Sequence, residues 1–95
     1  MVLKYKPKFR RDLLQLKGKA QLSEKVFAVI KQIKSASSLS EIPGYKSLDE
    51  YKIRFRIKIK ISDKEDYRMG LIIKNNIIWA ERILPRPNFY KFYRR

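Results

Sequence analysis

The chain has 95 residues and is strongly basic, with 24 Lys and Arg against 9 Asp and Glu and a formal net charge of +15. This length predicts one domain over residues 1–95, with a small core. The charge predicts an anionic partner, which could be nucleic acid, an anionic membrane surface or an acidic protein. The chain contains neither Cys nor His, which excludes disulfides, thiolate metal sites and the commonest general base.

The sequence contains no signal for export or membrane insertion. The N-terminal segment MVLKYKPKFRRD lacks the apolar centre of a secretory signal. No apolar run reaches the roughly 18 residues that span a membrane. We therefore expect a soluble, cytoplasmic protein with no membrane partner.

The first third of the chain predicts a short strand followed by two helices. Residues 2–5 (VLKY) are compatible with a strand, and Pro7 suits the first turn of a helix. An apolar stripe at helical spacing begins at Phe9, and Gly18 interrupts it. A second stripe of the same period runs through residues 21–35. We therefore expect a strand and a helix pair.

The rest of the chain predicts a linker and three strands. Residues 35–50 are rich in Ser and include a Pro-Gly turn. The segment YKIRFRIKIKI (51–61) alternates apolar and cationic residues, and YRMGLIIK (67–74) and IIWAERILP (77–85) follow as further strands. A basic aromatic tail, RPNFYKFYRR, ends the chain. The order predicts a two-layer α+β domain, in which an N-terminal strand and helix pair pack on an antiparallel sheet (β-α-α-β-β-β).

The strand at residues 51–61 predicts a sheet with one apolar and one cationic face. Its apolar residues would pack on the helices, while Lys52, Arg54 and Arg56 would point outward from the open face. Outward residues of one strand lie about 6.5–7 Å apart, which is comparable to the spacing of phosphates along a single nucleic-acid strand. The alternative is that these cations only keep the strand soluble and discourage edge pairing.

The aromatic residues of the C-terminal tail predict contacts with unpaired bases. Phe89 and Tyr93 follow Arg86, whose planar guanidinium can grip a phosphate with two hydrogen bonds. Aromatic rings beside cations favour single-stranded RNA over a duplex major groove.

Three segments resemble the RelE/ParE superfamily of bacterial toxin–antitoxin toxins. IPGYKSLDEYKIRFRI resembles the turn and strand that enter their central sheet, DYRMGLIIKNNIIWAERIL is similar to their YRIGF hairpin, and RILPRPNFYKFYR looks like their terminal segment, in which Tyr follows Arg by four residues. The resemblance covers the chain from Lys4 onward and implies a RelE-like fold.

The resemblance also implies an activity. The RelE branch consists of endoribonucleases that cut mRNA in the ribosomal A site without a metal, by attack of the RNA's own 2′-hydroxyl on the neighbouring phosphate. It therefore implies mRNA and ribosomal RNA as partners, a cognate acidic antitoxin, and no cofactor.

Individual residues match the motifs of that branch. Arg68 matches the Arg of the YR motif, and Arg86 and Tyr90 match the Arg and Tyr of the terminal segment. We expect both arginines to stabilise the charge that develops on the phosphate, and Tyr90 to orient the 2′-hydroxyl or exchange a proton. The predicted catalytic set is Arg68, Arg86 and Tyr90, and the predicted RNA-binding set is Lys52, Arg54, Arg56, Phe89 and Tyr93.

Two other functions stay open at this point. The ParE branch shares the fold but inhibits DNA gyrase and lacks nuclease residues, and a non-enzymatic basic RNA-binding protein would have the same charge. Several relatives carry a His or a carboxylate in the site, whereas this chain has no His and we expect Glu81 to pair with a neighbouring cation. The nuclease hypothesis requires folding to bring Arg68, Arg86 and Tyr90 together.

Overall fold

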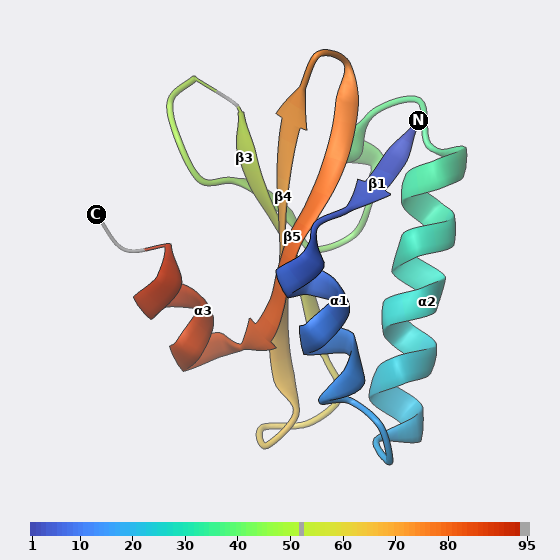
Figure 1. Cartoon of the computed structure of the whole chain (residues 1–95), viewed down its shortest axis with the longest axis vertical. Coiled ribbons are helices and arrows are strands. Elements are labelled where there is room, and N and C mark those ends of the chain that lie inside the picture. The colour runs from blue at the N-terminus through green and yellow to red at the C-terminus, as the bar shows by residue number, and fades with distance from the viewer. Residues whose placement is uncertain (52, 94–95) are drawn as a thin grey trace.

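The computed structural model describes residues 1–51 and 53–93, which form a five-stranded sheet with helices on both faces (Figure 1). The strand order is β1-β5-β4-β3-β2, in which β1 runs parallel to β5 and the other neighbours are antiparallel. The predicted α+β class, with a strand and a helix pair ahead of an antiparallel meander, is confirmed. In chain order the elements are β1 (Leu3–Tyr5), α1 (Pro7–Leu14), α2 (Ala20–Ser35), the 3₁₀ turn η1 (Leu39–Glu41), β2 (Tyr45–Ser47), β3 (Arg54–Lys60), β4 (Asp66–Lys74), β5 (Ile77–Pro85) and α3 (Arg86–Phe92).

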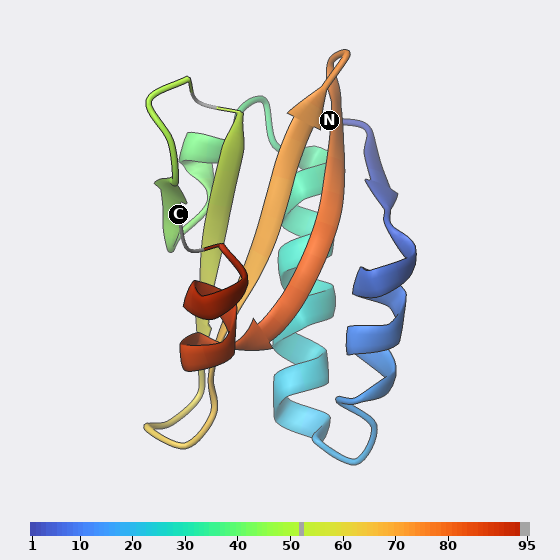
Figure 2. The ribbon, with the colours of Figure 1, turned by 60° about the vertical axis from the view of Figure 1, so that its left-hand side comes forward.

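Helix α2 covers one face of the sheet and, together with Phe9 of α1, supplies the helical side of the core. Figure 2 shows it on the opposite face from α3. Its buried residues recur three or four positions apart, as expected of an amphipathic helix. Ile53 is one of the apolar residues of segment 51–61 that we expected to pack on the helices, but it precedes β3 and is 44% exposed. The core side chains from α2 and the sheet include Leu22, Val26, Ile30, Ile33, Phe55, Ile57, Ile59, Met69, Leu71, Ile78 and Ile83.

Strand β1 and helix α1 lie one after the other along the same edge of β5. Strand β1 pairs only with the first half of β5, up to Ala80, so the next backbone groups of β5 need other partners. The buried carboxylate of Asp12 accepts a hydrogen bond from the backbone N–H of Ile83 at 3.0 Å. It also accepts hydrogen bonds from Nε and Nη2 of Arg82 at 2.8 and 3.0 Å. One side chain therefore fastens α1 to the sheet.

The Ser-rich segment contains an edge strand that the sequence did not predict. Strand β2 is three residues long and pairs with β3. Gly44, at a φ of +84°, precedes it, and the Gly44 carbonyl accepts the backbone N–H of Lys58 at 3.0 Å. A Cβ at Gly44 would come within 2.9 Å of the Lys58 backbone, so only glycine allows this approach.

The first seven residues of the C-terminal tail form helix α3, which covers part of the face that we expected to be open. Phe89 is fully buried beneath it, and the ring of Tyr93 lies 4.4 Å from the Phe89 ring, centroid to centroid. Gly70 on β4 makes this possible, because a Cβ there would lie 2.6 Å from Cζ of Tyr93. The register also shifts between Gly70 and Leu71, which is a β-bulge.

We expect Gly70→Ala to lower the free energy of unfolding by about 1–3 kcal/mol, because the added methyl overpacks the contact between α3 and the sheet. Urea denaturation measures this change. In a Tyr93→Ala background the methyl meets no ring, so the same substitution should cost much less. Equal costs in the two backgrounds would contradict this account of Gly70.

Candidate active site

Arg68 is a buried cation with an unused hydrogen-bond donor. The residue is 4% exposed, and its Nη1 donates to the carboxylate of Asp66 and, at 3.2 Å, to the carbonyl oxygen of Tyr67. Its Nε is also buried and has no hydrogen-bond partner among residues 1–51 and 53–93. A buried donor without a partner lowers the stability of the fold, and a ligand that accepts a hydrogen bond from it removes this cost. Arg68 is therefore a rigidly held positive charge whose Nε keeps an unused donor.

Tyr90 on α3 lies among three arginines. The guanidinium carbon of Arg86 lies 5.8 Å from the centroid of the Tyr90 ring. Partial burial acts to raise the pKa of Tyr90, but the guanidinium groups of Arg68 and Arg56 outweigh it, and the pKa is lowered from its ordinary value of 10.0. The residue is 39% exposed, so solvent and ligands can reach it.

Arg56 reaches this group from β3. Its Nη1 donates to the carbonyl oxygen of Gly44 at 2.6 Å, and its buried Nε has no partner in the described part of the chain. Arg56 pairs across the strands with Gly70, and Lys58 pairs with Arg68, so these side chains share one face of the sheet. We call Arg56, Arg68, Arg86 and Tyr90 the Arg–Tyr cluster.

The structure brings the three predicted catalytic residues together and adds Arg56 from the predicted RNA-binding set. Their catalytic roles stay predictions. Arg54, from the same set, has a side chain that is 43% exposed, and its Nε lies 3.6 Å from Oε1 of Glu81. Lys52 lies outside the described residues.

Two aromatic residues predicted to contact RNA are used in folding instead. Phe89 is 0% exposed, so the prediction that it stacks on a base is wrong. Tyr93 packs against it and donates its hydroxyl to Oε1 of Glu81 at 3.0 Å. Burial, and then the nearby carboxylate, raise the pKa of Tyr93 far above its ordinary value. The helical spacing of four places these two rings on the same side of α3, but only the orientation of α3 in the fold shows that this side is buried.

Glu81 anchors a second polar network beside α3. Its Oε2 accepts a hydrogen bond from Nζ of Lys6 at 2.9 Å, while its Oε1 accepts the hydroxyl of Tyr93 and pairs with Arg54. The residue is 8% exposed. The expectation that Glu81 pairs with neighbouring cations is confirmed. This carboxylate ties α3 to β3, β5 and the start of α1.

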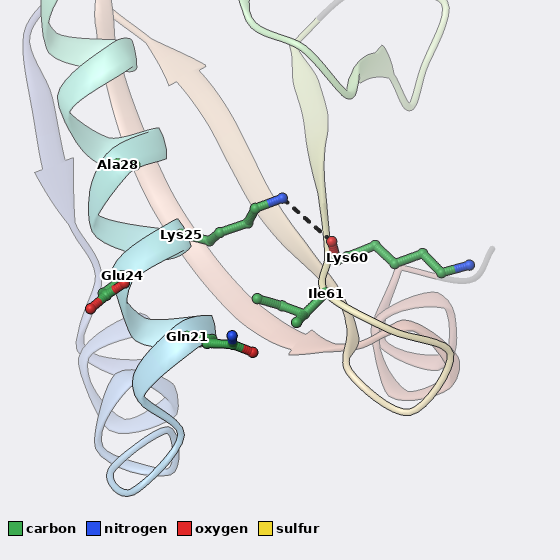
Figure 3. A pocket seen from close by; sticks show the side chains of 6 residues that line it. All are labelled: Gln21, Glu24, Lys25, Ala28, Lys60 and Ile61. Atoms are coloured by element: carbon green, nitrogen blue, oxygen red, sulfur yellow. Dashed lines mark hydrogen bonds between the residues drawn. The ribbon is translucent and has the colours of Figure 1, made fainter.

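The surface hollow in Figure 3 lies on α2 and the end of β3, and it does not include the Arg–Tyr cluster. The interaction drawn there is a hydrogen bond of 3.5 Å from Nζ of Lys25 to the carbonyl oxygen of Lys60. No group of three or more Asp or Glu side chains that could hold a metal occurs within residues 1–51 and 53–93. In the same residues, no helix has the length and apolar character needed to cross a membrane.

No family model and no curated protein matches the sequence. Two solved structures, however, resemble the fold of this chain. The chain is similar to a chain of the RelB-RelE antitoxin-toxin complex from Methanococcus jannaschii, with a TM-score of 0.71 and 20% identity over 95% of this chain and 98% of that chain. It is also similar to YafQ from E. coli strain BL21(DE3), with a TM-score of 0.70 and 12% identity over 93% and 96% of the two chains. The RelE-like fold expected from the sequence is therefore confirmed along nearly the whole chain.

Proposed function

We propose that the protein is a single-domain toxin of a toxin–antitoxin pair that cleaves mRNA on the ribosome in the cytoplasm. The observation that carries this proposal is the Arg–Tyr cluster, in which three arginines surround a tyrosine of lowered pKa and two of them keep buried, unpaired Nε donors. The net charge of +15 supports an RNA substrate. The likeness to a chain of an antitoxin-toxin complex supports the toxin role.

In the proposed reaction, the scissile phosphate lies among the arginines of the Arg–Tyr cluster. The 2′-oxygen of the RNA attacks the adjacent phosphorus, the bond to the 5′-oxygen of the next nucleotide breaks, and a 2′,3′-cyclic phosphate forms. Negative charge grows on the non-bridging oxygens during this step. Donors that are already in place, such as those of Arg56 and Arg68, stabilise it without reorganising.

Tyr90 is the proposed base of this reaction. Arginine stays protonated in proteins, so Tyr90 is the member of the Arg–Tyr cluster that can change charge. Its phenolate takes the proton of the 2′-hydroxyl, and the departing 5′-oxygen takes a proton from water. The hydroxide that remains takes the proton from Tyr90 and restores the phenolate. The neighbouring guanidinium groups raise the phenolate fraction by lowering the pKa of Tyr90.

Primer extension on mRNA from cells that express the protein tests the proposed function. We expect new 5′ ends inside translated codons with the unaltered protein, and their loss with Arg86→Ala. Gyrase-linked DNA breaks without RNA cuts would replace the proposal with a ParE-like activity. RNA binding without cuts or growth arrest would replace it with a non-enzymatic RNA-binding protein.

We also propose an acidic antitoxin that lays an amphipathic helix along the groove between α1 and α2. The groove is lined by apolar side chains, among them Phe27, which is 55% exposed. A rim of cations borders it, which matches acidic residues beside an apolar stripe. The groove is lined by Tyr5, Arg10, Leu13, Phe27, Ile30, Lys31 and Lys34.

We expect Phe27→Ser to weaken binding of the acidic protein encoded beside this chain by at least about 30-fold, which corresponds to a hot-spot loss of about 2 kcal/mol. Isothermal titration calorimetry measures the dissociation constant. Ile53→Ser removes a comparably exposed apolar side chain outside the groove and should leave affinity unchanged. An unchanged affinity for Phe27→Ser would contradict the groove as the antitoxin site.

A further inference from the structure

Another surface hollow lies between α1 and α3. Figure 1 shows these two helices beside the same end of β5. The hollow shares no residue with the Arg–Tyr cluster. Four of its side chains are cations and one is a carboxylate, so it is an anion-attracting site in its own right. The side chains that matter here are Lys6, Lys8, Arg11, Glu81, Arg82 and Phe92.

The carboxylates around this hollow are already occupied. Glu81 accepts hydrogen bonds from Lys6 and Tyr93, and Asp12 is held by Arg82 and a backbone N–H. By contrast, Lys8 and Arg11 form no ion pair within residues 1–51 and 53–93. Their positive charges are therefore available to a ligand.

Phe92 gives the hollow an aromatic wall. The residue is 45% exposed, although burial of its ring would be favourable. The guanidinium carbon of Arg82 lies 4.7 Å and Nζ of Lys8 lies 5.6 Å from the centroid of its ring. Asp12 fixes the Arg82 guanidinium with two hydrogen bonds, so this arrangement exists before a ligand arrives. A ring that is partly exposed and has cations beside it suits a nucleotide, whose base stacks on the exposed part of the ring while its phosphate meets the cations.

We propose that this hollow binds a flanking nucleotide of the RNA strand that the Arg–Tyr cluster cleaves. Lys8 and Arg11 hold its phosphate, and its base stacks on Phe92. The inference rests on the proposed function. An α-helix with its side chains is about 10–12 Å across, so a strand that crosses α3 reaches the hollow roughly two nucleotides from the scissile bond. The hollow therefore adds affinity for longer RNA without touching the reacting atoms.

The test measures RNA binding separately from cleavage. Fluorescence anisotropy compares the unaltered protein with Lys8→Gln/Arg11→Gln, using a single-stranded RNA oligonucleotide and a dinucleotide as probes. We expect the double variant to bind the oligonucleotide about tenfold more weakly, with a salt slope smaller by about 0.7, because the contact to one phosphate of a single strand is lost. Dinucleotide binding should not change, because that probe does not reach the hollow. Cleavage at saturating RNA should also be unchanged.

Matched variants distinguish binding of RNA at this hollow from general attraction of RNA to the positive charge of the protein. Lys31→Gln/Lys34→Gln removes the same charge from α2 and should change oligonucleotide binding less than the double variant in the hollow. Phe92→Leu should also weaken binding of the oligonucleotide, because it removes the stacking surface. Equal losses in both double variants would overturn the proposal, as would unchanged binding by Phe92→Leu. If no RNA is cleaved and the selective binding loss persists, the nuclease function fails while the nucleotide site stands.

Discussion

Arg68→Ala should reduce ribosome-dependent cleavage of mRNA by about 10²–10³-fold, which is the usual effect of removing one preorganised donor from a developing anion. Arg68 is buried, held by Asp66, and retains an unpaired Nε donor, so solvent cannot replace it with the same geometry. The rate is measured on ribosomes programmed with a defined mRNA.

Two further variants separate catalysis from folding. Arg68→Lys keeps the charge but loses the planar fork, and we expect it to stay folded and still lose at least about tenfold in rate. Lys58→Ala removes the exposed cation that pairs with Arg68 across the strands and should cut at nearly the normal rate. A rate for Arg68→Ala that is as close to normal as the rate for Lys58→Ala would contradict a catalytic role for Arg68.

Tyr90→Phe should lower the cleavage rate by about 10²–10⁴-fold, the range expected when a general base is removed. The substitution keeps the ring that lies 5.8 Å from the guanidinium carbon of Arg86, so it isolates the hydroxyl. Binding of RNA should change little. A variant that cuts at the normal rate would exclude Tyr90 as the base.

The pH dependence gives an independent test of Tyr90. Because the phenolate is the active form, the rate should rise with pH toward the lowered pKa of Tyr90. Arg56→Gln removes a charge that stabilises the phenolate, so the pKa of Tyr90 rises and the ascending limb moves to higher pH. Absorbance titration of the tyrosines should show the same shift, and the corresponding transition should be absent in Tyr90→Phe. An unmoved limb would contradict the assigned role.

The elements with a strong internal period were predictable from the sequence. The stripes of the two N-terminal helices and the alternation in β3 arise from one buried face, which the sequence displays directly. Strand β4 does not alternate, because residues 68–72 are all buried. The strand at 51–61 was predicted too long, since β3 spans Arg54–Lys60. The carboxylate of Asp49 accepts the backbone N–H groups of Ile53 and Arg54 at 3.0 and 3.3 Å, so the chain turns there before the strand begins.

The elements that depend on distant partners were not predictable. Strand β2 has three residues and exists through its pairing with β3. Helix α3 has seven residues and is stabilised by Phe89 against the sheet and by the space at Gly70, neither of which is visible in a local pattern.

The candidate site was predictable in part for the same reason. Motif spacing singled out Arg68, Arg86 and Tyr90, and folding places them together. Which aromatic residues face solvent depends on the orientation of α3, so the sequence could not separate the buried Phe89 from the exposed Phe92. Arg56 joins the Arg–Tyr cluster because the register of β3 with β4 places it on the same face of the sheet as Arg68.

The central claim is that the Arg–Tyr cluster cuts RNA, and the chemistry of the cut ends tests it most directly. Ribosomes with an empty A site on a defined mRNA are incubated with the unaltered protein or with Tyr90→Phe, and the fragment ends are identified by mass spectrometry. We predict a 2′,3′-cyclic phosphate on the upstream fragment and a 5′-hydroxyl on the downstream fragment, both strongly reduced in the variant. Intact mRNA with the unaltered protein, or equal cleavage by the two proteins, would contradict the claim.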